Sequence, residues 1–363
     1  MIIDKSNIYV LIMAGGVGSR FWPMSRNEFP KQFIDILGTG NSLLQTTYER
    51  FSDITVNENI YVLTNKLYGN IVKKQLPELI STNILLEPDK KNTAPCLAYA
   101  SYKIYQKNPK AIIIVAPSDH LILKENNFKD IIINAVKFAA NEESIMTLGI
   151  KPTRPDTGYG YIKFNSKTNN DSIFEVESFF EKPNINTAEQ YILEGSYLWN
   201  AGIFIWSVKA ILNSFENYAH NIHEIFLQGM PFYNTNKEQS FIEKVYSTCP
   251  NISIDYAILE KANNVYTIPS DIGWSDLGTW ASLHQVSIKD DFGNSITTDL
   301  SNLESTKNCL IKVKKEKAVV IKGLDNYIIV DQDDVLLIYP KNLEQEIKDV
   351  SSLVSKNFGS NFV

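Results

Sequence analysis

Two patterns of apolar and polar positions follow each other in turn along the first 150 residues. Longer segments with helical periodicity separate short apolar runs that are rich in β-branched residues. The runs that predict strands cover residues 8–13, 60–64, 84–87, 111–115 and 144–149. Alternation of this kind predicts an α/β fold with a mostly parallel sheet, flanked by helices, whose ligands bind beyond the carboxyl ends of the strands.

The pattern changes in the middle of the chain. Residues 161–164, 174–180 and 201–206 alternate over longer runs, which predicts antiparallel strands. Helical patterns return at residues 241–246 and 255–262. We expect this half to cover an acceptor substrate.

A polar stretch at residues 289–307 resembles a connection, and it predicts a domain boundary near residue 290. The chain then divides into a domain of residues 1–290 and a smaller one of residues 291–363. Four short runs at close spacing predict a small all-β unit there: residues 309–313, 318–321, 327–331 and 335–339. A final helix is predicted by one apolar face, formed by Leu343, Ile347, Val350 and Val354.

Composition and charge narrow the class of protein. With 363 residues, 44% hydrophobic and 21% charged, the chain is typical of a globular protein with two domains. A net charge of -6 and the lack of a long basic run argue against a nucleic-acid partner.

The cysteines and the apolar runs indicate a compartment. Cys96, Cys249 and Cys309 are too far apart for a zinc site or a disulfide framework, so we expect buried thiols in a reducing environment. Residues 1–7 lack the features of a secretion signal, and the apolar run 111–116 is too short to span a membrane. These features predict a cytoplasmic protein with no membrane partner.

A glycine-rich loop follows the first predicted strand. Missing Cβ atoms let the backbone approach an anion, although an ordinary tight turn has the same composition. Arg20 and Lys31 favour a triphosphate site, because they supply the positive charge that such a ligand needs. The loop residues predicted to contact the nucleotide are Ala14, Gly15, Gly16, Gly18, Ser19 and Arg20. The loop lacks both the P-loop ending and the dinucleotide fingerprint, so ATPase and dehydrogenase activities are disfavoured.

This loop, with the downstream pair Pro30 and Lys31, resembles the sugar-phosphate nucleotidyltransferase family. Trp22, Ser25, Arg26 and Gln32 make the chain similar to the mannose-1-phosphate guanylyltransferase branch, and similar segments recur in order to residue 339. Small departures from the branch occur at Ser19, Phe21 and Lys91. The resemblance implies a Rossmann-like fold of the glycosyltransferase-A type.

Two aspartates stand apart from other charges. Asp119, with Ser118 before it, follows the apolar run 111–115, and Asp276 lies in a weakly charged stretch far downstream. Each could simply cap a helix, but two carboxylates with phosphates suit Mg²⁺. The resemblance implies that Asp119 and Asp276 hold this metal and that Ser118 lies at the nucleotide.

The segment around Asn92 and Thr93 predicts a helix start, with one of the two as the cap and Pro95 in the first turn. Capping alone would explain these residue types. The resemblance implies that Asn92 and Thr93 also help to select guanine.

The residues that bind the acceptor, a sugar 1-phosphate, are inferred mainly from the resemblance. The family uses three segments here, which implies a sugar-phosphate pocket formed by Gly158, Tyr159, Glu181, Lys182, Asn200 and Gly202. Asp255 matches a fourth segment near the sugar, although it could cap a helix instead. A surface ion pair is the simpler explanation of Glu181 beside Lys182.

The resemblance implies transfer of a guanylyl group from GTP to mannose 1-phosphate, with Arg20, Lys31, Asp119 and Asp276 as the catalytic residues. Another sugar 1-phosphate, such as a heptose or glucose phosphate, is the alternative within the same chemistry. A non-catalytic nucleotide-sugar sensor is the alternative from another class. Isomerase activity is not expected, because the chain stops after the small β unit, and edges of that unit suggest a homodimer.

Overall fold

The computed structural model describes residues 4–168 and 172–363, so Met1, Ile2 and Ile3 of the N-terminal stretch considered above lie outside it. The chain forms two compact units. The first, here called the sheet unit, comprises Met1–Gly15, Thr47–Ser118 and Ile122–Trp274. The second, the coil unit, comprises Gly16–Thr46, Asp119–Leu121 and Ser275–Val363. The boundary near residue 290 stays a prediction.

A nine-stranded sheet, in the order β3-β2-β1-β4-β9-β6-β10-β8-β7, forms the centre of the sheet unit. Four neighbouring strands at one end are parallel, as predicted. They are β1 (Ile8–Met13), β2 (Ile60–Asn65), β3 (Ile84–Glu87) and β4 (Ile112–Pro117). Their carboxyl ends therefore meet at one edge, the position where α/β sheets bind ligands.

The strands from the middle of the chain extend the same sheet. The long strand β9 (Tyr197–Ser207) runs antiparallel between β4 and β6 (Ile145–Ile150). Beyond it lie β10 (Val265–Pro269), β8 (Phe174–Phe180) and β7 (Tyr161–Phe164). The predicted antiparallel strands are thus confirmed.

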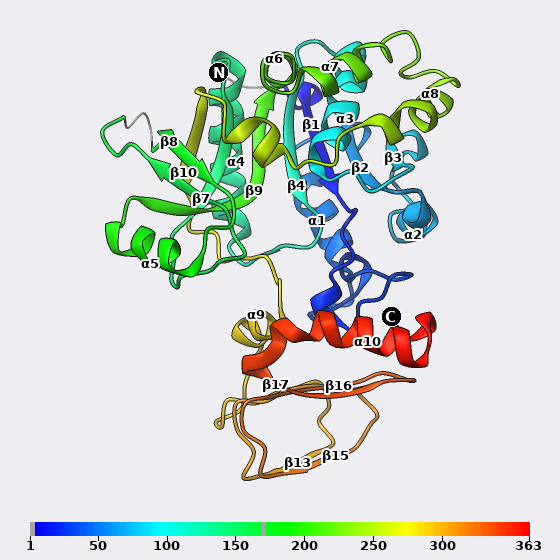
Figure 1. Ribbon diagram of the computed structural model, residues 1–363, viewed down its shortest axis with the longest axis vertical. Coiled ribbons are helices and arrows are strands. Elements are labelled where there is room, and N and C mark those ends of the chain that lie inside the picture. Colours follow the sequence, from blue (N-terminus) through cyan, green and yellow to red (C-terminus); the bar gives the residue numbers. More distant parts are fainter. Residues whose placement is uncertain (1–3, 169–171) are drawn as a thin grey trace. The chain divides into compact units, whose positions relative to one another are not determined.

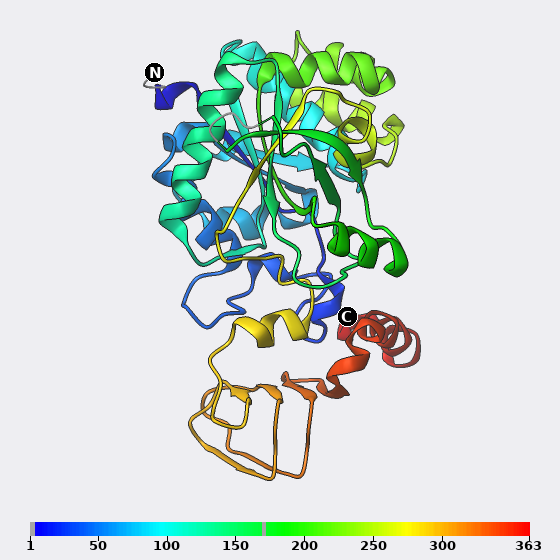
Figure 2. The ribbon, with the colours of Figure 1, turned by 90° about the vertical axis from the view of Figure 1, so that its left-hand side faces the viewer.

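Helices cover both faces of the sheet (Figure 2). Tyr9 and Leu11 of β1 lie in an apolar core between the sheet and the helices on one of its faces. The alternate residues Ile8, Val10 and Ile12 are also buried, but they do not belong to that core. Since successive side chains of a strand alternate between faces, β1 is covered on both, which explains its unbroken apolar sequence. The layer that packs on Tyr9 and Leu11 includes α3 (Thr93–Lys107), α6 (Val208–Tyr218), α7 (His220–Leu227) and α8 (Glu238–Val245). Helix α4 (Glu125–Asn141) packs on β4 and β9.

Three further helices precede β9 in the chain. They are α1 (Leu43–Ser52), α2 (Gly69–Gln75) and α5 (Ile185–Glu194). No helix among the described residues is long and apolar enough to cross a membrane. All three cysteines are free and buried, as expected.

The coil unit carries the predicted all-β part, visible in orange in Figure 1. Short parallel ladders stack as turns of a coil: β12 (Ser295–Ile296) pairs with β14 (Leu310–Lys312), β14 with β16 (Tyr327–Asp331), and β13 (Ser301–Glu304) with β15 (Val319–Lys322). Strand β17 (Leu336–Pro340) closes the sheet antiparallel to β16. Helices α9 (Trp280–Val286) and α10 (Ile347–Phe358) complete the unit.

One apolar core joins distant stretches of the coil unit. Phe21 and Trp22 from the glycine-loop stretch pack in it with Trp280 of α9 and Ile347 of α10. Burial of Ile347, with Val350 and Val354 partly buried against the same core, confirms the predicted final helix. Leu343, the first residue of the predicted face, is instead exposed and lies in a short 3-10 helix before α10.

Candidate active site

The glycine-rich loop leaves its backbone donors open. Among the described residues, the N–H groups of residues 15–18 donate to no acceptor. Successive free N–H groups form a concave donor surface that suits phosphate oxygens. Arg20 is exposed and pairs with no other described residue, so its guanidinium is also available to an anion.

Gly18 is required by the backbone of this loop. It lies in the left-handed region (φ +69°), and a Cβ there would come within 2.6 Å of the Lys31 Cβ. The loop carbonyls, by contrast, are engaged: Ser25 Oγ donates to Val17 O (2.6 Å) and Gln32 Nε2 donates to Gly16 O (2.8 Å). These bonds fix the loop without using its N–H groups.

Lys31 brings the two predicted metal ligands together within the coil unit. Its side chain is 4% exposed, and its Nζ lies 2.8 Å from Asp119 Oδ2. The same ammonium donates to the backbone oxygens of Asp276 and Leu277, each at 2.9 Å. All three donors of the ammonium are therefore used inside the protein. Direct contact of Lys31 with the triphosphate stays a prediction.

The carboxyl group of Asp119 remains ionised in this environment. Burial would raise its pKa, but the charges of Lys31 and of His120 outweigh burial and hold the pKa below the ordinary value. The side chain is 31% exposed, so the carboxylate is also accessible to a ligand.

Asp276 lies at a strained turn. Its Oδ1 accepts from Gly278 N (3.0 Å), and Leu277 adopts φ +44°, which is rare for a side-chain residue. Strain of this kind persists only where the surrounding structure enforces it, and it is common at functional sites.

The carboxylates of Asp119 and Asp276 fit the predicted metal. Carboxylate oxygens are the ligands that Mg²⁺ prefers, and one or two of them usually suffice, with phosphates and water completing the shell. The described residues contain no group of three or more His, Cys, Asp or Glu side chains that could hold a metal. Lys31 contacts the carboxylate of Asp119 and the backbone oxygen of Asp276, and Mg²⁺ held by these two residues with a phosphate of the substrate stays a prediction.

The predicted cap at the start of α3 is confirmed, and it is strained. Asn92 has φ 64° and ψ −168°, a conformation populated almost only by glycine, while its Oδ1 accepts from Thr93 N (3.0 Å). Thr93 Oγ1 accepts from Ile254 N (2.8 Å). Both side chains thus have structural bonds, and their role in guanine selection stays a prediction.

In the sheet unit, Ser118 is buried directly after β4, and its N–H donates to Met13 O (3.0 Å). Ala14 follows β1 in the same way, and its N–H donates to Leu63 O (2.8 Å). Both residues are therefore held at the carboxyl edge of the parallel strands.

Three of the predicted sugar-pocket residues meet in the sheet unit. Asn200 Oδ1 accepts from Gly202 N (3.1 Å), and Asn200 Nδ2 donates to Asp255 Oδ1 (3.2 Å). Burial and, to a smaller extent, the charge of Glu181 raise the pKa of Asp255 to about 6. Lys182 Nζ forms an ion pair with Glu181 Oε1.

The loop before β7 is organised by residues that sequence reasoning missed. Gly158 N donates to Asp156 Oδ1 (2.8 Å), and Arg154 pairs with the same carboxylate (2.7 Å). Tyr159 packs edge-on against Trp199, with ring centroids 5.0 Å apart. The charge alternation of Arg154 and Asp156 was the available signal, but exposed loops often carry such pairs.

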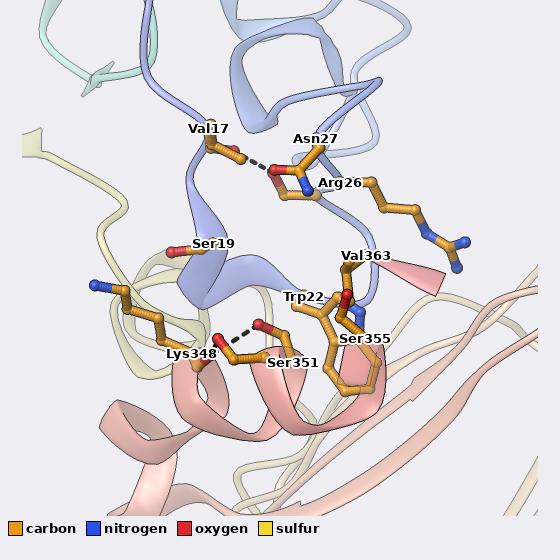
Figure 3. A pocket seen from close by; sticks show the side chains of 11 residues that line it. Val17, Ser19, Trp22, Arg26, Asn27, Lys348, Ser351, Ser355 and Val363 are labelled. Carbon is orange, nitrogen blue, oxygen red and sulfur yellow. Dashed lines mark hydrogen bonds between the residues drawn. The ribbon is translucent and has the colours of Figure 1, made fainter. Parts of the chain in front are cut away.

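A pocket of about 320 Å³ lies between the stretch after the glycine loop and α10 (Figure 3). Its lining is rich in hydroxyl groups, from Ser19, Ser25, Ser351, Ser352 and Ser355. Beside it, Arg26 forms a two-pronged ion pair with Asp334, with N–O distances of 2.5 and 2.7 Å. These contacts tie residues 17–27 to the end of the coil unit.

Similarity to known proteins identifies the class of enzyme. The family model described as nucleotidyl transferase matches residues 9–291. The chain therefore belongs to the nucleotidyl transferase family.

Its relatives within that family specify the branch. A mannose-1-phosphate guanylyltransferase of Escherichia coli is 35% identical over 95% of this chain and 75% of its own length. A putative mannose-1-phosphate guanylyltransferase of Vibrio cholerae is 35% identical over 94% of this chain and 73% of its own. A xanthan biosynthesis protein of Xanthomonas campestris is 34% identical, covering 96% and 73%.

Solved structures agree with the fold. A crystal structure described as a mannose-1-phosphate geranyltransferase from Thermus thermophilus superposes with a TM-score of 0.86 and 27% identity, over 96% of this chain and 99% of that one. A mannose-6-phosphate isomerase from Helicobacter pylori shares the fold, with a TM-score of 0.60 and 20% identity, over 74% and 99%. The resemblance to the mannose-1-phosphate guanylyltransferase branch is confirmed.

Proposed function

We propose that this enzyme transfers the guanylyl group of GTP to mannose 1-phosphate, with Mg²⁺, and releases diphosphate. The observation that carries the proposal is the set of open N–H groups at residues 15–18 beside the unpaired Arg20. A triphosphate needs such donors and such charge. Identity to curated guanylyltransferases supports guanosine and mannose as the partners. The cytoplasm, where GTP is formed, is the proposed location.

The reaction needs no protein nucleophile. An oxygen of the mannose phosphate attacks the α-phosphorus of GTP, and the bond to the bridging oxygen of diphosphate breaks on the opposite side. The phosphate is largely ionised at neutral pH, so no strong base has to remove a proton. Catalysis then depends on positioning and on neutralising charge.

Each residue has one task in this mechanism. The loop N–H groups and Arg20 bind the triphosphate and stabilise the leaving diphosphate. Asp119 and Asp276 would hold Mg²⁺, which supplies further positive charge to the phosphates. Lys31 fixes the position of Asp119 through their 2.8 Å contact. Lys182 would bind the acceptor phosphate, and this ion pair would replace its present one with Glu181.

Asn200, Asp255 and Glu181 provide the acceptors for sugar hydroxyls. The pKa of Asp255 is raised mainly by burial and further by repulsion from the charge of Glu181. Sugar hydroxyls can donate to both and relieve that repulsion, since each carboxylate oxygen accepts more than one bond.

The test is diphosphate release with Mg²⁺ across a matrix of nucleoside triphosphates and sugar 1-phosphates. We expect turnover with GTP and mannose 1-phosphate together. A preference for another pair would keep the mechanism and change the specificity. No release with any pair would contradict the proposal and favour a nucleotide-sugar sensor.

The metal ligands have a separate test. We expect Asp276→Asn to lower turnover by ~10²-fold or more, the scale of a lost electrostatic stabiliser. Folding should be unaffected, because the amide oxygen can still accept from Gly278 N. Asp271→Asn, at an exposed aspartate paired with Lys124, is the control and should leave turnover unchanged. A folded Asp276→Asn enzyme with normal turnover would refute the metal assignment.

A further inference from the structure

The hydroxyl-lined pocket beside the glycine loop has no task in the proposed mechanism. It lies within the coil unit, between residues 17–27 and α10 (Figure 3). The side of α10 that faces the pocket carries polar residues at helical spacing: Lys348, Ser351, Ser352 and Ser355. Ile347 of the same helix packs in the apolar core instead. Because most side chains on the pocket side are small, the space between the helix and the loop stays open.

The serines of this pocket present oxygen atoms that accept hydrogen bonds. Ser25 Oγ donates to Val17 O (2.6 Å). Ser351 Oγ and Ser352 Oγ donate to Lys348 O, at 2.8 and 3.1 Å. A hydroxyl has one donor and two acceptor positions, so these three groups offer a ligand their acceptor positions. A molecule with several hydroxyl donors, such as a sugar, fits this lining.

Positive charge is available from Lys348. Its ammonium bonds to no other described residue, whereas the guanidinium of Arg26 is neutralised by Asp334. Figure 3 shows the ammonium and the Ser19 hydroxyl on the same side of the pocket, and this hydroxyl also bonds to no other described residue. An ammonium and a hydroxyl together bind phosphate through charge-assisted hydrogen bonds. The pocket therefore has a position for one anionic group beside its hydroxyl acceptors.

The size of the pocket limits the ligand. Its volume of about 320 Å³ lies at the lower end of the range for ligand pockets, roughly 300–1,000 Å³. This volume suits a phosphorylated monosaccharide, whereas a nucleotide sugar, with its base and second sugar, would exceed it. The ring of Trp22 adds an apolar wall for the C–H face of a sugar.

We propose that this pocket binds a sugar monophosphate as an effector, and that the bound effector strengthens the binding of GTP. The sugar hydroxyls donate to the serine oxygens, and the phosphate pairs with Lys348. The effect on GTP rests on the proposed function. Val17 and Ser19 line the pocket and also belong to the glycine-loop stretch. A ligand that holds these two residues favours the conformation with open loop N–H groups, so it shifts the population toward the state that binds a triphosphate.

Calorimetric titration of the wild type and of Lys348→Met, with mannose 1-phosphate and mannose 6-phosphate in separate runs, tests the pocket. We expect one equivalent of at least one compound to bind about tenfold or more weakly in Lys348→Met, the scale of a hydrogen bond to a charged group. A difference for mannose 1-phosphate identifies the acceptor substrate as the occupant, and a difference confined to mannose 6-phosphate identifies a separate sugar phosphate. Identical isotherms of wild type and variant with both compounds would overturn the inference.

Two further variants are matched to this test. Lys356→Met removes an exposed lysine of the same helix that does not line the pocket, and it should leave the isotherms unchanged. Ser355→Leu fills the pocket without changing its charge, and it should weaken the same equivalent as Lys348→Met. Weaker binding in Lys356→Met, or unchanged binding in Ser355→Leu, would contradict a site in this pocket.

Diphosphate release measures the coupling to GTP. With mannose 1-phosphate and the effector both saturating, KM for GTP should be about fivefold or more lower in the wild type than in Lys348→Met, the lower end of usual coupling between two sites. The two enzymes should have the same kcat. Equal KM values would overturn the effector role. Absence of turnover with every substrate pair would contradict the proposed function instead, and the titrations would still decide whether the pocket binds a sugar phosphate.

Discussion

Replacing Lys31 with methionine removes the ammonium that connects three groups of the coil unit while keeping most of the apolar stem. The variant leaves the Asp119 carboxylate and the carbonyls of Asp276 and Leu277 without their donor. Because methionine is close to lysine in length, we expect little cavity formation. The effect should therefore be electrostatic.

The magnitude follows from burial. Breaking a fully buried ion pair from one side costs about 3–5 kcal/mol. Asp119 is 31% exposed and can recover some solvation, which lowers the cost. We expect Lys31→Met to reduce the free energy of unfolding by about 2–3 kcal/mol.

Urea-induced unfolding measures this loss, and its pH dependence identifies the cause. Lys31 helps to hold the pKa of Asp119 below its ordinary value. A depressed pKa adds stability above the unfolded-state pKa of about 3.9, and that stability is lost as pH falls through the folded-state pKa. The difference between wild type and Lys31→Met should therefore shrink below about pH 4.

Lys124→Met removes a lysine from an exposed pair, with Lys124 48% and Asp271 82% exposed, and serves as the control. It should cost less than about 1 kcal/mol. A loss in Lys31→Met no larger than in this control would refute the reasoning, as would a loss that stays constant from pH 7 to pH 3.

Two further substitutions test backbone strain. Gly18→Ala should lower the free energy of unfolding, measured in thermal melts, by about 2 kcal/mol, because φ is +69° and the added Cβ would contact Lys31. Gly16→Ala is the control: the space around Gly16 is open, so this substitution should cost less than about 1 kcal/mol. Equal losses in the two variants would contradict the strain at Gly18. Asn92→Gly should raise stability by about 1 kcal/mol, because relief of its strained conformation exceeds the few tenths lost at the cap; a lower melting temperature than wild type would argue against strain.

Much of the fold was predictable because each buried strand corresponds to a short run of apolar residues in the sequence. The predicted runs 8–13, 84–87 and 327–331 coincide with β1, β3 and β16. The place of β9, antiparallel between β4 and β6, was not predictable, because strand order depends on packing between distant segments. The same is true of the coil, whose parallel ladders join runs that local pattern shows only as separate strands.

The site divides in a similar way. The cap at Asn92 followed from local residue chemistry, which a sequence displays directly. Contacts of Lys31 with Asp276, 245 residues later, could not be read from either segment alone.

The interleaved coil unit has a consequence for how the protein is made. Trp280 Nε1 donates to Trp22 O, a contact between residues 258 positions apart. At 5–20 residues per second, Phe21 and Trp22 leave the ribosome roughly 10 to 50 s before the partners that bury them. During that interval two large aromatic side chains lack part of their core, so the nascent chain is at risk of aggregation unless a chaperone covers them.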